Sequence, residues 1–298
     1  MLRLTIAAVG SNLLIARNLR TTLEFLFQDQ IQLPTYCTKD VIADTPADLF
    51  VCALSQYVKL RQVLPPDRLV AFKMVPTSRF FSRMAAIPQG ETIYVFNNYP
   101  AYAECLSACC RSLEINGLKF VPIAYEVLPQ EEIKRLLGQA HYVAGTDYFI
   151  RSVLLRDPYR QFLAPDVVLV PARHMISIPS SYRLFHRMAA LYYKDSVERV
   201  HALQKLAVVQ PLSIEAAAAL ERDILCYAGG LYTASLRMTT RSPHPTGTLA
   251  ADAAEPMCFP EDALQRLPAA LAKLGELGEK FAVLAAPFSG REQEFLSI

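Results

Sequence analysis

The segment Thr5-Ile6-Ala7-Ala8-Val9-Gly10-Ser11-Asn12 has the pattern of an apolar strand that ends in a small polar turn, and an amphipathic stretch from 13 to 28 follows it. The same arrangement returns at Thr92-Ile93-Tyr94-Val95-Phe96-Asn97-Asn98, before a second helical stretch from 99 to 116. Alternation of strands and helices is typical of parallel sheets with right-handed crossovers. The sequence therefore predicts an α/β fold with two Rossmann-like (flavodoxin-like) lobes.

The remaining elements of each lobe follow from apolar runs and turn residues. In the first lobe the first strand begins at residue 4, and the pattern predicts further strands at 31–38, 48–54 and 69–76 and helices at 57–63 and 79–87. In the second lobe it predicts strands at 92–97, 119–125, 141–146 and 167–171 and a helix at 129–140, with an irregular stretch at 147–165. The near-continuous apolar strands are those expected of buried parallel sheets.

These elements divide the chain into four parts. We expect lobe one at 1–88, lobe two at 89–178, a long connecting helix at 179–210 and a small, mostly helical region at 211–298. Within the last part the pattern indicates a helix at 215–227, a strand at 231–238 after a glycine pair, and a final helix interrupted by Pro268. The function of this last region cannot be assigned from its sequence.

Composition excludes several classes of protein. Of the 298 residues, 52% are hydrophobic and 19% charged, enough to fill the cores of two domains. The net charge of +2 is too small to indicate a nucleic-acid surface. No apolar run is long enough for a membrane span, and the first residues do not resemble a signal peptide. We therefore expect a cytoplasmic protein without membrane or direct nucleic-acid partners.

The cysteines favour a reduced, metal-free protein. Cys37 and Cys52 occupy strand-like runs, where a small buried hydrophobic residue is the simpler interpretation. Cys105 and Cys109 lie one turn apart on a predicted helix, but no nearby histidine or CxxC motif supports a metal site. No sequence motif calls for a cofactor, so we expect none.

Small and polar residues gather where predicted strands end. Ligands of open α/β sheets bind beyond the carboxyl ends of strands, so these corners predict a ligand cleft. The candidate ligand-binding residues are Gly10, Ser11, Asn12, Thr77, Ser78, Asn97, Asn98, Tyr99, Thr146, Asp147 and Arg173.

Each of these corners also has a plainer interpretation. Ser11 or Asn12 either binds an anion at the helix start or simply caps the helix. At the second corner Asn98 is a candidate cap, which would leave Asn97 to hydrogen-bond a ligand. Thr77, Ser78 and Thr146, each taken alone, fit ordinary caps or turns. Arg173 either clamps a carboxylate or is a solvated side chain.

Catalytic patterns are sparse. The chain has no GxSxG, HExxH, GxGxxG or P-loop motif. A phosphoryl-accepting receiver needs acidic residues after strands one and three, where this chain has Gly10-Ser11-Asn12 and Ala53-Leu54-Ser55, so we reject that function. Asp147 and His174 are the two candidates for a general base.

The segment from 91 to 178 resembles the second lobe of a bacterial sensory domain. The strings ETIYVFNN, FVPIAYEVLPQEEI, HYVAGT and DVVLVPARHMIS occur in the expected order. The resemblance, which covers about residues 1–200, is to the N-terminal effector-sensing domain of propionate-catabolism activators and related sigma-54-dependent regulators. It implies two Rossmann-like lobes that close on a small metabolite and a helix that relays their state. Residues 211–298 depart from that family, because they contain neither a Walker A loop nor a helix-turn-helix.

The sequence thus favours a sensor that binds a small anionic metabolite and closes by a hinge near 88–90 and 179–180. An isomerase or lyase with its active site in the same cleft is one alternative, and an interaction protein that has lost its ligand is another. The helix at 180–210 carries an apolar stripe that includes Tyr192 and Tyr193. If part of that stripe is uncovered, we expect it to pair with its own copy in a homodimer.

Overall fold

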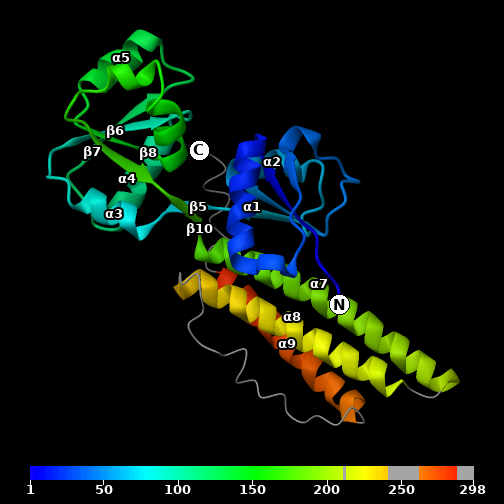
Figure 1. Cartoon of the computed structure of the whole chain (residues 1–298). Coiled ribbons are helices and arrows are strands. Elements are labelled where there is room, and N and C mark those ends of the chain that lie inside the picture. The colour runs from blue at the N-terminus through cyan, green and yellow to red at the C-terminus, as the bar shows by residue number, and fades with distance from the viewer. Residues whose placement is uncertain (211–212, 241–261, 287–298) are drawn as a thin grey trace. The chain divides into compact units, whose positions relative to one another are not determined.

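The computed structural model describes residues 1–210, 213–240 and 262–286, and the chain forms two compact units (Figure 1). Unit 1 contains residues 1–73 together with the described residues from 176 onward, and unit 2 contains residues 74–175. The chain therefore passes from unit 1 to unit 2 and back again. Each unit is built around a parallel four-stranded sheet.

The sheet of unit 1 has the strand order β2-β1-β3-β4, with all pairs parallel. Its strands are β1 (Ile6–Gly10), β2 (Thr35–Cys37), β3 (Leu49–Ala53) and β4 (Leu69–Phe72), and its helices α1 (Leu13–Phe27) and α2 (Leu54–Arg61) follow β1 and β3. All five residues of β1 are buried, because this central strand is covered on both faces.

The sheet of unit 2 repeats that order as β7-β6-β8-β9, again with all pairs parallel. Its strands are β6 (Thr92–Asn97), β7 (Lys119–Ala124), β8 (Tyr142–Thr146) and β9 (Val168–Ala172). Its helices are α3 (Ser78–Ala85), α4 (Tyr102–Ser112), α5 (Gln130–Gly138) and the single turn α6 (Asp147–Phe149). Beyond α6 lie a π-helical turn at Ile150–Leu154 and a 3₁₀ turn at Tyr159–Phe162. The predicted α/β class and its pair of similar parallel sheets are confirmed.

The boundaries between the parts differ from those predicted. Helix α3 belongs to unit 2, since Phe80 and Met84 are buried in one cluster with Ile93 and Val95 of β6. The first lobe therefore ends at 73 rather than 88, and the crossings lie at 73–74 and 175–176 rather than at the predicted hinge points. The crossing segments β5 (Met74–Pro76) and β10 (His174–Ile176) pair as a two-stranded sheet.

The long helix α7 (Ile178–Val209) belongs to unit 1. At its start the Ser177 N–H donates to the Lys73 carbonyl at 2.8 Å, and the Lys73 N–H donates to Ser180 Oγ at 3.0 Å. The ring of Phe185 then meets Phe27 of α1 edge-to-face, with centroids 5.7 Å apart. The start of α7 therefore packs on α1 within unit 1.

Helices α7, α8 (Ile214–Thr240) and α9 (Ala263–Ala285) pack side by side in unit 1 (Figure 1). The strand predicted at 231–238 is wrong, because α8 continues through Gly229 and Gly230 without interruption. A Cβ at Gly230 would lie 2.7 Å from Gln30 Oε1, so the glycine allows the close approach of that side chain. Helix α9 likewise continues through Pro268, which lies in its first two turns.

Packing within unit 1 buries one face of the first part of α7, including Phe185, Ala189 and Tyr192. Tyr192 is 5% exposed, whereas Tyr193 beside it is 42% exposed. The most exposed of its large apolar side chains, Leu206, Val208 and Val209, lie at the C-terminal end of the helix. The homodimer predicted through this helix stays a prediction, and part of the stripe, including Tyr193, is exposed. Among the described helices, none is both long and apolar enough to cross a membrane.

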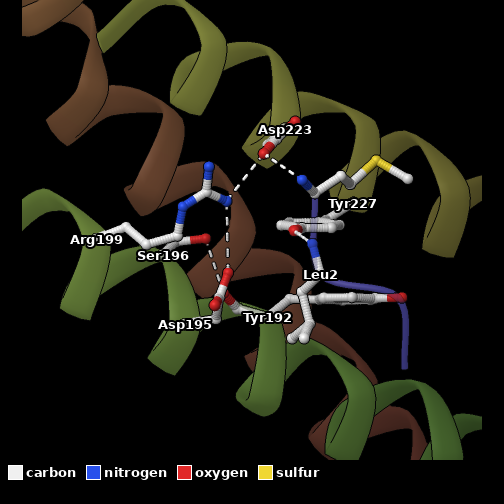
Figure 2. A network of polar contacts seen from close by, with 8 residues as sticks. Leu2, Tyr192, Asp195, Ser196, Arg199, Asp223 and Tyr227 are labelled. Atoms are coloured by element: carbon white, nitrogen blue, oxygen red, sulfur yellow. Dashed lines mark hydrogen bonds and ion pairs between the residues drawn. The ribbon is translucent and has the colours of Figure 1, made fainter. Parts of the chain in front are cut away.

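A polar network fastens the N-terminal segment to α7 and α8 (Figure 2). Arg199 Nη1 lies 2.8 Å from Asp223 Oδ2 and 3.6 Å from Asp195 Oδ2, and the Met1 amino group lies 3.1 Å from Asp223. The Leu2 N–H donates to the Tyr227 hydroxyl. Burial raises the pKa of Asp223, but the hydrogen bonds and positive charges of Arg199 and the amino group outweigh it, so the pKa is lowered overall. The network keeps Asp223 ionised.

Candidate binding site at the carboxyl edge of the second sheet

The corner after β6 is formed by Asn97, Asn98 and Tyr99. Asn97 is 5% exposed, and its Oδ1 accepts a hydrogen bond from the Tyr99 N–H at 3.1 Å. Asn97, and not the predicted Asn98, therefore closes this turn, and its side-chain oxygen is already used. Asn98 is half-buried and Tyr99 is 55% exposed. Of this corner, Tyr99 presents the largest surface to a ligand.

The corner after β8 carries a small ionic cluster. Thr146 caps the next turn, since its Oγ1 accepts a hydrogen bond from the Phe149 N–H at 3.2 Å. Asp147 Oδ1 accepts from Arg151 Nε at 2.8 Å, and its Oδ2 lies 3.9 Å from Arg173 Nε. The Asp147 side chain is 25% exposed, whereas those of Arg151 and Arg173 are 62% and 73% exposed. Two accessible guanidinium groups thus flank one carboxylate, which leaves the corner with a net charge of +1.

The segment after β9 brings His174 against Tyr102 of α4. His174 Nδ1 lies 3.1 Å from the Ala172 carbonyl, and its Nε2 lies 2.9 Å from the Tyr102 hydroxyl. A carbonyl can only accept, so Nδ1 carries the proton and Nε2 accepts from tyrosine. Burial lowers the pKa of His174, against the opposing effect of the Ala172 hydrogen bond. Burial also raises the pKa of Tyr102, with smaller contributions from Cys109 and Cys105.

Both candidate general bases are therefore already engaged. His174 has a partner on each ring nitrogen, and Asp147 is held by two arginines. A general base needs a nitrogen or oxygen that reaches the substrate proton.

Thr77 and Ser78 belong to unit 2 and not, as predicted, to the first lobe. The Thr77 N–H donates to the Arg173 carbonyl at 2.9 Å, within the segment that joins β5 and β10 to the rest of the unit. Thr77 is half-buried at the start of α3, and Ser78 is exposed as its first residue. Both residues are thus linked through the backbone to the segment that carries Arg173.

The corresponding corner of unit 1 holds Gly10, Ser11 and Asn12. Asn12 caps α1, since its Oδ1 accepts from the Ile15 N–H at 3.0 Å. A Cβ on Gly10 would lie 2.5 Å from the Ala16 nitrogen, so only glycine fits between the strand and the helix. Ser11 is exposed. The plainer interpretation holds for Asn12, whose side-chain oxygen is already used.

The sequence reasoning missed several polar residues of these edges. The sequence pattern places Tyr102 within a helix and Arg151 within an irregular stretch, and neither position indicates a role in the site. Thr38 was not singled out either, although its Oγ1 lies 3.0 Å from both the Gly10 carbonyl and Gln56 Oε1. The pairing of Arg151 with Asp147 is predictable from their spacing, because residues four positions apart lie side by side on one helical turn.

Two cavities lie within single units. One, of about 570 Å³, is in unit 2 beside α4 and β7. The other, of about 470 Å³, is in unit 1 around Thr45, Asp48 and Arg68. Neither is lined by the ionic cluster at Asp147. Within the described part of the chain, no cluster of histidine, cysteine and acidic side chains has the composition and spacing of a metal site.

Comparisons with known proteins do not name a family. No family model, curated protein or solved structure matches this chain.

Proposed function

We propose that this protein binds a small anionic metabolite at the carboxyl edges of its parallel sheets and acts as a sensor of that metabolite. The observation that carries the proposal is the cluster of Arg151, Asp147 and Arg173, with its net positive charge beyond β8 and β9. Arginine binds carboxylates and phosphates through two parallel hydrogen bonds, and carboxyl ends of parallel strands are where such folds bind ligands.

In this proposal Arg173 is the ligand's main contact. Its guanidinium is the more exposed of the two, and its 3.9 Å separation from Asp147 is longer than a hydrogen bond. An anion can therefore approach Arg173 without breaking a strong ion pair. Arg151 holds Asp147 more tightly, at 2.8 Å, and so fixes the carboxylate away from the ligand.

Sensing would use the Rossmann-like arrangement of the lobes and the helices after them. Two sheets with one strand order, joined by two crossings, suit a protein that closes on a ligand by hinge motion. The long helix α7 begins directly after the second crossing, at residue 178, and is the natural element to relay that motion. This agrees with the resemblance to effector-sensing domains of bacterial transcriptional regulators.

A thermal-shift screen of the whole chain tests the proposal. The panel should contain small mono- and dicarboxylates, phosphorylated metabolites and nucleotides, with amines and neutral sugars as negative controls. We expect at least one small anion to raise the unfolding temperature, because a ligand that binds only the folded state stabilises it. Stabilisation by neutral or cationic compounds alone would overturn the proposed ligand class.

A further inference from the structure

The cavity in unit 2 is a groove between helix α4 and strand β7. Its floor is apolar and includes Ala103, Phe120 and Pro122. Its polar lining comes from Glu104, Ser107 and Arg111 of α4. These three residues are spaced by three and four positions, so they follow one face of the helix along the length of the groove.

The two charged residues of the groove, Glu104 and Arg111, have no ionic or side-chain hydrogen-bond partner in the described part of the chain. Both are exposed. Glu104 lies in the first turn of α4 and Arg111 in the last, where each also complements the helix dipole. The dipole explains the position of each charge along the helix. It does not require that both line one apolar groove.

Strand β7 limits what kind of ligand fits. It is an edge strand of the sheet. The N–H groups of Lys119 and Tyr125 donate to the carbonyls of Glu91 and Asn97, on the side of β6. Backbone groups along a strand point alternately to its two sides, so the N–H and C=O groups of even-numbered residues face the free edge of the sheet. Pro122 has no N–H to offer there, which disfavours addition of a long partner strand. The groove suits a short ligand held mainly by its charged ends.

We propose that this groove binds a short zwitterion, such as a peptide of about three residues with free termini. Its ammonium would pair with Glu104 and its carboxylate with Arg111. The two residues are seven positions apart on α4, which is roughly 10 Å along the helix axis, and an extended peptide of about three residues spans that distance. A single α-amino acid is too short to reach both charges. This site is separate from the anion site at Arg173.

Calorimetric titration of the whole chain with trialanine tests the inference. We expect trialanine to bind, and N-acetylation or C-amidation each to weaken binding by about tenfold or more, because each block removes one charge-assisted contact. The variants Glu104→Gln and Arg111→Gln should weaken trialanine binding similarly. Glu104→Gln should become insensitive to acetylation, and Arg111→Gln to amidation.

Matched controls separate the groove from general effects on helices. Glu131 lies in the first turn of α5 and Arg61 is the last residue of α2, so Glu131→Gln and Arg61→Gln change the same dipole contacts outside the groove. Both variants should bind trialanine as the unaltered chain does. Equal affinity for free and doubly blocked trialanine, or no binding at millimolar peptide, would overturn the inference. Because the blocked peptides are tested on the unaltered chain, this outcome does not depend on how any variant folds.

Discussion

The ring of Tyr192 in α7 lies flat against the ring of Tyr227 in α8, with centroids 4.1 Å apart and planes inclined by 10°. Both residues are nearly inaccessible, with Tyr192 5% and Tyr227 3% exposed. Figure 2 shows the pair beside the network that holds the N-terminal segment. This ring contact joins α7 and α8 within unit 1. Tyr227 contributes both its buried ring and the hydroxyl that accepts the Leu2 N–H.

Replacement of Tyr227 should separate these two contributions. Tyr227→Ala removes a buried ring and should lower the free energy of unfolding by about 3–5 kcal/mol. Tyr227→Phe keeps the ring but removes the hydroxyl that accepts the Leu2 N–H, and should cost only about 1 kcal/mol. Urea denaturation followed by circular dichroism measures both. Similar losses in the two variants would show that the ring contact contributes little.

Stability should fall in mild acid because of His174. Its pKa in the folded chain lies below the usual 6.5, so the unfolded chain takes up the proton first as the pH falls. Stability is thus unaffected by this group above pH 6.5 and declines as the pH drops from there through the lowered pKa. The urea midpoint of the unaltered chain should decrease more over this range than that of His174→Gln. Parallel curves would contradict the account of the ring as buried and neutral.

Replacement of two glycines by alanine should change the stability of the chain in opposite directions. A Cβ at Gly145 in β8 would lie 2.4 Å from the Phe96 carbonyl oxygen, so Gly145→Ala should destabilise by about 1–3 kcal/mol. Gly229 lies inside α8 with nothing within 4 Å of its would-be Cβ, so Gly229→Ala should stabilise by roughly 0.5–1 kcal/mol. Melting temperatures of the two variants check the signs. A stabilising Gly145→Ala would mean that β6 and β8 are less closely placed.

Asn97 should matter for folding as well as for the site. Its buried amide accepts the Tyr99 N–H, so Asn97→Ala should destabilise by about 1–2 kcal/mol through the lost bond and the unpaired donor. The half-buried Asn98 has no such bond among the described residues, and Asn98→Ala should change stability by less than about 0.5 kcal/mol. Equilibrium unfolding of the two variants side by side tests the assignment of the cap. A larger loss at Asn98 would reverse it.

The sequence predicted what local patterns determine. Strand β6 was placed at 92–97, where the structure has it, and α1 was placed within one residue, because apolar periodicity and a polar turn bound both elements. What failed depended on distant contacts. Nothing within residues 79–87 reveals that Phe80 packs under β6, and nothing in the glycine pair of α8 reveals the side chain of Gln30 against it.

The strand ends that bear the candidate site are predictable from the sequence for the same reason. Strand ends could be located, so Asp147 and Arg173 were both named. Their pairing across β8 and β9 depends on strand order, and the contact of Tyr102 with His174 on the placement of α4. These relationships come from tertiary structure and leave no mark at short sequence separation.

Whether Arg173 binds an anion is tested most directly by calorimetry with the anion that the thermal-shift screen identifies. The comparison is between the unaltered chain, Arg173→Gln and Arg160→Gln, the last being an exposed arginine of the same unit outside the cluster. We expect Arg173→Gln to bind this anion at least about tenfold more weakly, because one charge-assisted contact is lost, and Arg160→Gln to bind it with unchanged affinity. Equal affinity in all three proteins would contradict an anion site at Arg173.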